Sequence, residues 1–86
     1  MILYVISAEY VDDYKIKVKF NDSTSGIADF KQTVSTDHRS IIRELFDLKK
    51  FKAFAVEADT IVWDNGVDFA PEFIKSLCQG RQERFL

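Results

Sequence analysis

The segment YKIKVKF, residues 14–20, decides the fold class because apolar and charged side chains alternate along it without a break. Every second residue is apolar, and the residues between them are Lys15, Lys17 and Lys19. A period of two is typical of a β-strand with one buried and one solvated face. We therefore expect an antiparallel strand that buries its apolar side chains and exposes its lysines.

Two more strands are expected beside this segment. Residues 3–11 are rich in β-branched and aromatic side chains, and Asp12 with Asp13 favours a tight turn between the two runs. Residues 21–26 concentrate turn-forming residues, and the apolar run 27–30 can return as a third strand. The first third of the chain is thus predicted to form a three-stranded antiparallel meander.

A helical stripe replaces the period of two after residue 34. A helix is expected over residues 37–48, with Ser35, Thr36 or Asp37 as its N-cap. Its apolar face would consist of Ile41, Ile42, Leu45 and Phe46. Phe51 then follows as a residue that closes the core.

A second hairpin and a second helix are predicted from residue 53 onward. The hairpin pairs residues 53–57 with residues 60–63. Its inward side chains would be Phe54, Val56, Ile61 and Trp63. The last helix begins at Pro71 and stops at Gly80.

The order β-β-β-α-β-β-α defines a small α+β fold with antiparallel pairing and two helices. We expect a single domain over residues 1–80 and a C-terminal tail over residues 81–86.

Length and composition exclude several classes of protein. The chain has 86 residues, a net charge of −2 and one cysteine, Cys78. A lone cysteine forms no internal disulfide, and no Cys and His cluster has the spacing of a structural zinc site. The chain begins without the basic region of a secretion signal, and no apolar run is long enough to span a bilayer. We therefore expect a cytoplasmic protein without membrane association.

Three residue sets invite a chemical role, and a structural explanation is favoured for each. Asp37 and His38 are the residue types of a general base, but Asp37 is also a good helix cap. Cys78 lies beside an apolar stripe and is interpreted as a small buried side chain. The acidic set is Asp59, Asp64, Asp68 and Glu72. Its spacing matches no calcium loop, and the isolated glycines form no phosphate loop, so neither a metal nor a cofactor is expected.

Two surfaces are candidates for contact with a partner. The lysine row Lys15, Lys17 and Lys19, with tyrosines nearby, has the composition of a platform for single-stranded nucleic acid. Alternating lysines also solvate a sheet face and discourage edge pairing, and we favour that explanation. The tail contributes the second surface, made of Arg81, Arg84, Phe85 and Leu86.

Residues 62–72, VWDNGVDFAPE, carry a more specific pattern. The run resembles the signature that closes the small bacterial family called domain of unknown function 2442, and the resemblance covers residues 4–77. The motif residues are Trp63, Asn65, Gly66, Asp68, Ala70, Pro71 and Glu72. Their expected roles are structural: Trp63 anchors the sheet, Asn65 and Gly66 turn the chain, and Asp68 with Pro71 starts the last helix. Ser23 and Asp64 depart from the family pattern, which commonly has Gly and Pro there.

The resemblance implies a small α+β domain without an established enzymatic activity. Similar members stand alone or are fused to a helix-turn-helix domain, and many are encoded beside a small toxin-like protein. Our leading hypothesis is a non-catalytic protein-interaction module, antitoxin-like or regulatory, whose partner is the product of a neighbouring gene. The alternatives are a homodimer, a nucleic-acid-associated accessory domain that uses the lysine row, and a small enzyme that uses Asp37 and His38.

Overall fold

Two antiparallel sheets form from the strands of this chain. The computed structural model describes the backbone of residues 2–84 and the side chains of residues 2–78. The larger sheet has the strand order β1-β2-β3-β6, with β1 Val5–Tyr10, β2 Lys15–Phe20, β3 Thr24–Asp29 and β6 Cys78–Arg84. The smaller sheet pairs β4 Phe54–Glu57 with β5 Thr60–Trp63. The α+β class and the meander β1-β2-β3 are confirmed.

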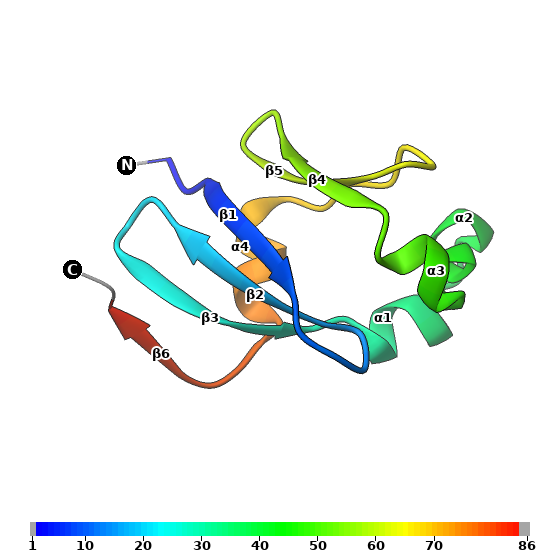
Figure 1. Cartoon of the computed structure of the whole chain (residues 1–86), viewed down its shortest axis with the longest axis horizontal. Helices are drawn as coiled ribbons and strands as arrows, with labels where there is room; N and C mark the ends of the chain where they lie inside the picture. Colours follow the sequence, from blue (N-terminus) through cyan, green and yellow to red (C-terminus); the bar gives the residue numbers. More distant parts are fainter. Residues whose placement is uncertain (1, 85–86) are drawn as a thin grey trace.

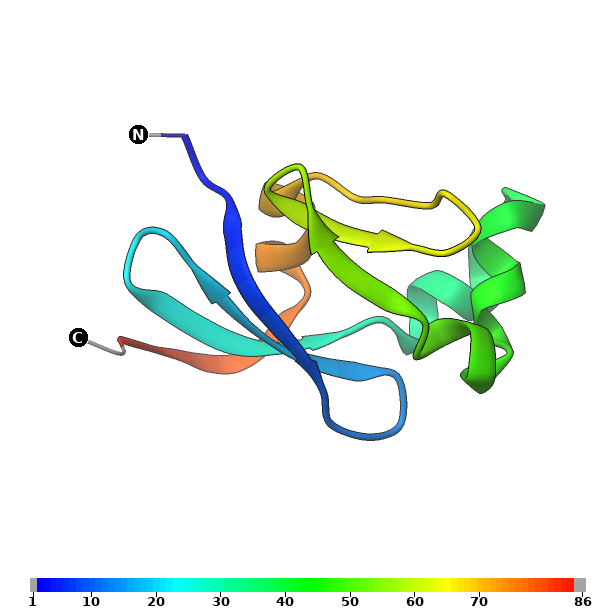
Figure 2. The same ribbon diagram turned by 45° about the horizontal axis from the view of Figure 1, so that its top comes forward.

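The helical elements are short and lie mainly at one end of the molecule. Between β3 and β4 they are α1 Lys31–Thr36, α2 Ser40–Arg43, the 3-10 helix η1 Glu44–Phe46 and α3 Leu48–Phe51. After β5 comes α4 Pro71–Ser76. Figures 1 and 2 show α1, α2 and α3 grouped at one end, whereas the N-terminal segment and the end of β6 lie at the other. We call the end formed by α1, α2, η1 and α3, residues 31–51, the helical end.

The alternation in residues 14–20 predicted the burial of β2 correctly. Ile16, Val18 and Phe20 are fully buried, while Lys17 on the other face is exposed. The remaining core comes mostly from aromatic and branched side chains of other elements, including Phe30, Phe51 and Trp63. The larger sheet therefore has one face in the core and one face in water.

Both predicted hairpin turns form, and both require positive φ angles in residues other than glycine. The β1-β2 turn has Asp13 at φ 44° and Tyr14 at φ 65°, and the β4-β5 turn has Ala58 at φ 48° and Asp59 at φ 69°. Two successive left-handed residues match the twist of the flanking strands but are unfavourable for side chains with a Cβ.

The strain in the β4-β5 turn leads to a first prediction. Replacing Ala58 by Asn and Asp59 by Gly should raise the free energy of unfolding by about 1 kcal/mol, because these residues adopt positive φ at lower cost. The hydrogen bond from Val5 N–H to the Asp59 carbonyl, 2.9 Å long, uses only backbone atoms and is kept. Urea denaturation measures the gain. As a control, Ala55→Gly inside β4 should destabilise, and a double variant no more stable than the parent would contradict the expectation.

The single helix predicted over residues 37–48 is wrong, because α2 and η1 cover only residues 40–46 and an aspartate lies on either side of them. Asp37 ends α1, and its carboxylate accepts the backbone N–H of Arg39 at 2.8 Å. Asp47 caps α3 through the N–H of Lys49 at 3.0 Å. Short aspartate side chains compete in this way with the helical hydrogen bonds. Asp37 therefore lies between two helices instead of at the start of one.

These breaks also alter the predicted apolar stripes. Ile42 and Leu45 are buried as expected, but Ile41 and Phe46 are 45% and 47% exposed. In the second hairpin, Ile61 and Trp63 are buried, Phe54 is partly buried, and Val56 was wrongly assigned inward because it is 37% exposed. Phe51 is fully buried, as predicted.

The glycines and the C-terminal segment differ from the expectation. Gly26 lies inside β3 opposite Val18, so the turn before β3 is shorter than predicted. The last helix ends at Ser76, and Gly80 belongs to β6. The segment predicted to be a tail is a strand up to Arg84, paired with β3, while Phe85 and Leu86 lie outside the described residues.

Candidate functional site

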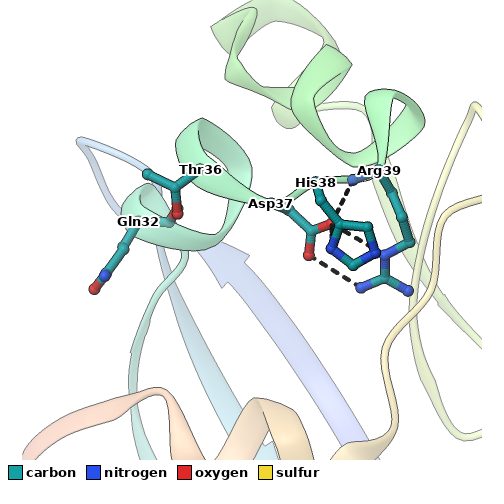
Figure 3. Close-up of polar contacts among 5 residues, drawn as sticks. All are labelled: Gln32, Thr36, Asp37, His38 and Arg39. Atoms are coloured by element: carbon teal, nitrogen blue, oxygen red, sulfur yellow. Dashed lines mark hydrogen bonds and ion pairs between the residues drawn. The ribbon is translucent and has the colours of Figure 1, made fainter.

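Asp37 and His38 do not form the hydrogen-bonded pair that a general base would use (Figure 3). The Asp37 carboxylate accepts two hydrogen bonds of 3.0 Å from the Arg39 guanidinium, which hold the pKa of Asp37 at about 2. His38 Nδ1 lies 3.8 Å from Asp37 Oδ1, and the imidazole is 91% exposed. The carboxylate is thus committed to Arg39, and an enzyme that uses this pair stays an untested prediction.

The structure places Cys78 against the core and the acidic set at the surface. Cys78 is partly buried against the core, its thiol lies 3.7 Å from the Ile74 carbonyl, and burial raises its pKa. The acidic residues Asp59, Asp64, Asp68 and Glu72 are exposed. Among the described residues, no group of three His, Cys, Asp or Glu side chains gathers as a metal site requires.

The lysine row lies on the solvated face of the larger sheet, with acidic residues beside it. Glu9 of β1 pairs with Lys17, and Asp29 of β3 pairs with Lys15. Asp13 in the preceding turn forms ion pairs with Lys31 at 3.2 Å and Lys15 at 3.6 Å, and these, the one with Lys31 above all, lower its pKa. Phosphate groups bind best where positive charge is concentrated. The alternating acids make the row a weak candidate for such a surface.

Trp63 anchors the smaller sheet to the helical end. Its side chain is 2% exposed, and its indole N–H donates to the Phe51 carbonyl at 2.7 Å. The ring packs against Phe30 and Phe69 with centroid distances of 5.5 and 5.7 Å. These contacts are those expected of a residue that anchors the sheet.

The predicted turn after β5 also forms, and Asn65 extends its reach. Gly66 adopts φ 90°, and the Asn65 side-chain oxygen accepts the N–H of Val67 at 3.1 Å. The Asn65 amide donates to the Ile41 carbonyl at 3.1 Å and to Glu44 Oε1 at 3.3 Å. One side chain thus closes the turn and ties it to the helical end.

The remaining motif residues start α4, with one correction. Pro71 occupies the first turn, as predicted, and Glu72 follows it in the same turn. Ala70 is the N-cap and makes no side-chain hydrogen bond. Asp68 instead forms an isolated β-bridge with Val62, so it extends the strand pairing and does not cap the helix.

An aromatic pair, in which Phe46 is exposed and Tyr14 is partly buried, lies where the helical end meets the β1-β2 turn. Tyr14 stacks on Phe46 with ring centroids 5.3 Å apart and planes 6° apart, and the Tyr14 hydroxyl donates to the Phe46 carbonyl. Phe46 is nevertheless 47% exposed, and two apolar residues close to this pair in the chain, Leu48 and Val11, are 37% and 46% exposed. We call these four residues, Val11, Tyr14, Phe46 and Leu48, the aromatic face.

Sequence reasoning missed the aromatic face because it placed Phe46 on a buried helical stripe. The signal that could have found it is Asp47, a strong N-cap residue, directly after Phe46. A helix that restarts at residue 48 leaves Phe46 outside the stripe.

The order of these elements and the motif agree with a known family. The family model for the protein of unknown function DUF2442 matches residues 5–80. The chain belongs to the DUF2442 family. No curated protein and no solved structure matches it. In the described part of this DUF2442 protein, no helix is long and apolar enough to cross a membrane.

A surface depression of the DUF2442 chain lies between α1 and α4 and measures about 680 Å³. Phe73 and Leu77 form its apolar wall. On the α1 side, the hydroxyls of Ser35 and Thr36 both donate to the Gln32 carbonyl. Two of the hydroxyls that line the depression are thus engaged within α1.

The β2-β3 turn contains Ser23, one of the two departures from the family pattern. An ion pair beside Ser23, between Asp22 and Lys75, links this turn to α4, and we call it the Asp22 tether. Ser23 adopts φ 68°, where the family commonly has glycine. Beside it, Asp22 forms an ion pair with Lys75 of α4 and accepts the Thr24 N–H at 3.1 Å. The bond from Lys75 is the largest cause, and together these bonds lower the pKa of Asp22 to about 2.

The Asp22 tether predicts a loss of stability in acid. Because the pKa of Asp22 in the folded DUF2442 chain lies below its ordinary value of 3.8, the stabilisation is complete above about pH 4 and is lost as pH falls toward 2. Asp22→Asn should cost about 1 kcal/mol at pH 7, since the site is partly exposed, and the difference should vanish near pH 2. Urea denaturation between pH 2 and 7 measures this. A double-mutant cycle with Lys75→Gln isolates the pair, and a difference independent of pH would argue against the tether.

Proposed function

We propose that this DUF2442 protein is a non-catalytic protein-interaction module that contacts its partner through the aromatic face. The observation that carries the proposal is the exposure of Phe46 at 47%, although its ring is held in place by Tyr14. Apolar side chains that a fold orders but leaves in water commonly mark binding surfaces.

The identity of the partner follows from the family resemblance rather than from the site. Similar proteins are encoded beside a small toxin-like protein, so we propose an antitoxin-like or regulatory role toward the product of a neighbouring gene. Self-association through β6 is less favoured. The β3-β6 register shifts between Ser25 and Ile27, and an irregular edge strand discourages pairing with a second copy.

Association with nucleic acid through Lys15, Lys17 and Lys19 is the second candidate, and it has less support. Lys15 and Lys17 lie beside carboxylates of the neighbouring strands, and the net charge of the chain is −2. A titration with labelled single-stranded DNA and RNA at two salt concentrations tests it, since binding through lysines must weaken as salt rises.

A comparison of two variants tests the proposed function. Tagged wild-type protein, Phe46→Ser and Phe73→Ser are incubated with nuclease-treated lysate of the source organism, and retained proteins are identified and sized by light scattering. Phe73 is 39% exposed and lies on α4, so it is a matched apolar control. Circular dichroism first establishes that each variant folds.

The proposal expects one stoichiometric protein that wild type and Phe73→Ser retain and Phe46→Ser loses. Retention by all three proteins, or by none of them, would reject the aromatic face as the binding site.

A further inference from the structure

The helical end is basic although the chain as a whole is acidic. Residues 31–52 contain six Lys and Arg side chains and three Asp and Glu side chains, against 12 and 14 in the whole chain. Lys49, Lys50 and Lys52 are exposed and form no ion pair with any described residue. This part of the surface therefore carries an excess of positive charge, which the carboxylates of Glu44, Asp47 and Asp64 beside Lys49 and Lys50 offset only in part.

The acidic side chains at the helical end already have partners of their own. Asp47 accepts the Lys49 N–H as the cap of α3, and Glu44 Oε1 accepts a hydrogen bond from Asn65. In the adjacent turn, Asp13 is held by two lysines from β2 and α1. Among the described residues, the cations at the helical end that form no ion pair are Arg43 of α2, Lys49 and Lys50 of α3, and Lys52 directly after α3.

The lysines follow the aromatic face directly in the chain, because Leu48 is the first residue of α3 and Lys49 and Lys50 come next in the same helix. Lys52 Nζ lies 5.0 Å from the centroid of the Tyr10 ring, and Tyr10 packs against Phe51 at 6.1 Å. Phe51 in turn contacts Tyr14 at 5.3 Å, and Tyr14 stacks on Phe46. A ligand that covers Phe46 and Leu48 would therefore come close to the lysines of α3.

The extent of this surface favours a short segment over a second copy of the chain. A stable dimer buries roughly 800 Å² on each partner, which is about a seventh of the 5317 Å² surface of this molecule. Four partly exposed side chains supply at most about half of that, since even a whole aromatic side chain buries roughly 150–250 Å².

We infer that the aromatic face binds an acidic segment of a partner protein, which places an apolar side chain against Phe46 and its carboxylates beside Lys49, Lys50 and Lys52. The inference rests on the proposed function and adds the chemistry of the partner. Opposite charge at the rim sets the choice of partner and speeds the encounter, while the apolar contact supplies the buried area.

Model peptides test this chemistry without the natural partner. The first is a hexapeptide with a central Phe-Leu pair between glutamates, the second has lysines instead, and the third has glutamates around Gly-Ser. Each is titrated to about 1 mM into the labelled full chain, and the backbone amide shifts are followed by NMR. The glutamate Phe-Leu peptide should give saturable shifts at Phe46, Leu48 and Lys49, with affinity at least about tenfold above that of the other two.

Two charge variants separate the proposed site from general electrostatics. Replacing Lys49, Lys50 and Lys52 by Gln should lower the affinity for the glutamate Phe-Leu peptide at least about fivefold. Lys17→Gln on the larger sheet should leave this affinity unchanged. Equal binding of the glutamate and lysine peptides, no saturable shift, or shifts confined to another surface would overturn the inference. So would a single-stranded oligothymidylate that shifts the same amides while the peptide does not.

The same triple variant distinguishes failure of the inference from failure of the proposed function. If lysate capture depends on Phe46 but is unchanged when the three lysines are replaced, the interaction module stands and the acidic partner is rejected. If Phe46→Ser and the triple lysine variant both lose the captured protein, the result supports both the interaction module and the acidic partner.

Discussion

Trp63→Ala is expected to lower the free energy of unfolding by about 3–5 kcal/mol. The side chain is 2% exposed, its indole N–H is bonded to the Phe51 carbonyl, and its ring contacts aromatic side chains from several elements. Removing it leaves a cavity between the two sheets and an unpaired buried carbonyl. A chain of this length has only about 4–13 kcal/mol of stability, so the variant should be partly unfolded at 37 °C.

Thermal and urea denaturation followed by circular dichroism measure this loss. Trp63→Phe separates the effect of the cavity from that of the lost hydrogen bond, because it keeps most of the ring and removes the donor. We expect this variant to lower the free energy of unfolding by about 2 kcal/mol. Ile2→Ala, at a side chain 83% exposed, serves as the control and should change stability by less than about 0.5 kcal/mol. A Trp63→Ala protein as stable as this control would refute the anchoring role.

The second large effect is expected at Thr60, a buried hydroxyl at the start of β5. Thr60 is 8% exposed, and its hydroxyl donates to the Phe69 carbonyl at 2.6 Å. Thr60→Val keeps the shape but leaves that carbonyl without its donor, which should cost about 2 kcal/mol. Thr60→Ser keeps the hydroxyl and removes a methyl group, which should cost less than about 1 kcal/mol.

Chemical denaturation of the two Thr60 variants decides between hydrogen bonding and packing. Val is expected to be the less stable replacement. If Ser proved the more damaging one, the methyl group and not the hydroxyl would be the feature that holds the segment after the Asn65 turn against β5.

Local patterns predicted those elements whose conformation depends on neighbouring residues. The alternation in residues 14–20 assigned the buried side of β2 correctly, since adjacent side chains of a strand point to opposite faces. Asn65 and Gly66 predicted a turn, and Pro71 predicted the first turn of α4, because both rest on the φ angle that a residue accepts.

Elements that depend on distant partners were missed or misplaced. The sequence of β6 has three charged residues and a glycine, a composition that does not predict a strand. The segment becomes a strand because it pairs with the edge of β3. The pairing begins beside the hydrogen bond of 3.1 Å from the Asp29 N–H to the Leu77 carbonyl. The helix expected over residues 37–48 breaks at Asp37 and Asp47, where side-chain hydrogen bonds replace helical ones. A periodic pattern contains no information on this competition.

The same division applies to the candidate sites. The motif around Trp63 and Asn65 was visible in the sequence, and its structural role followed from the residue types. The lysine row was visible too, but only the strand register revealed that Glu9 and Asp29 lie beside it. The aromatic face was not foreseen, because Tyr14 and Phe46 are 32 residues apart.

The sequence alone determined the α+β class, the meander and the family of this protein, since each depends on short-range periodicity or on a contiguous motif. Tertiary structure alone decided which apolar side chains remain in water and which charges remain unpaired. The physical reason is that burial and charge compensation are properties of residues brought together from distant parts of the chain, and at Phe46 and Lys52 that assembly left an apolar and basic surface uncovered.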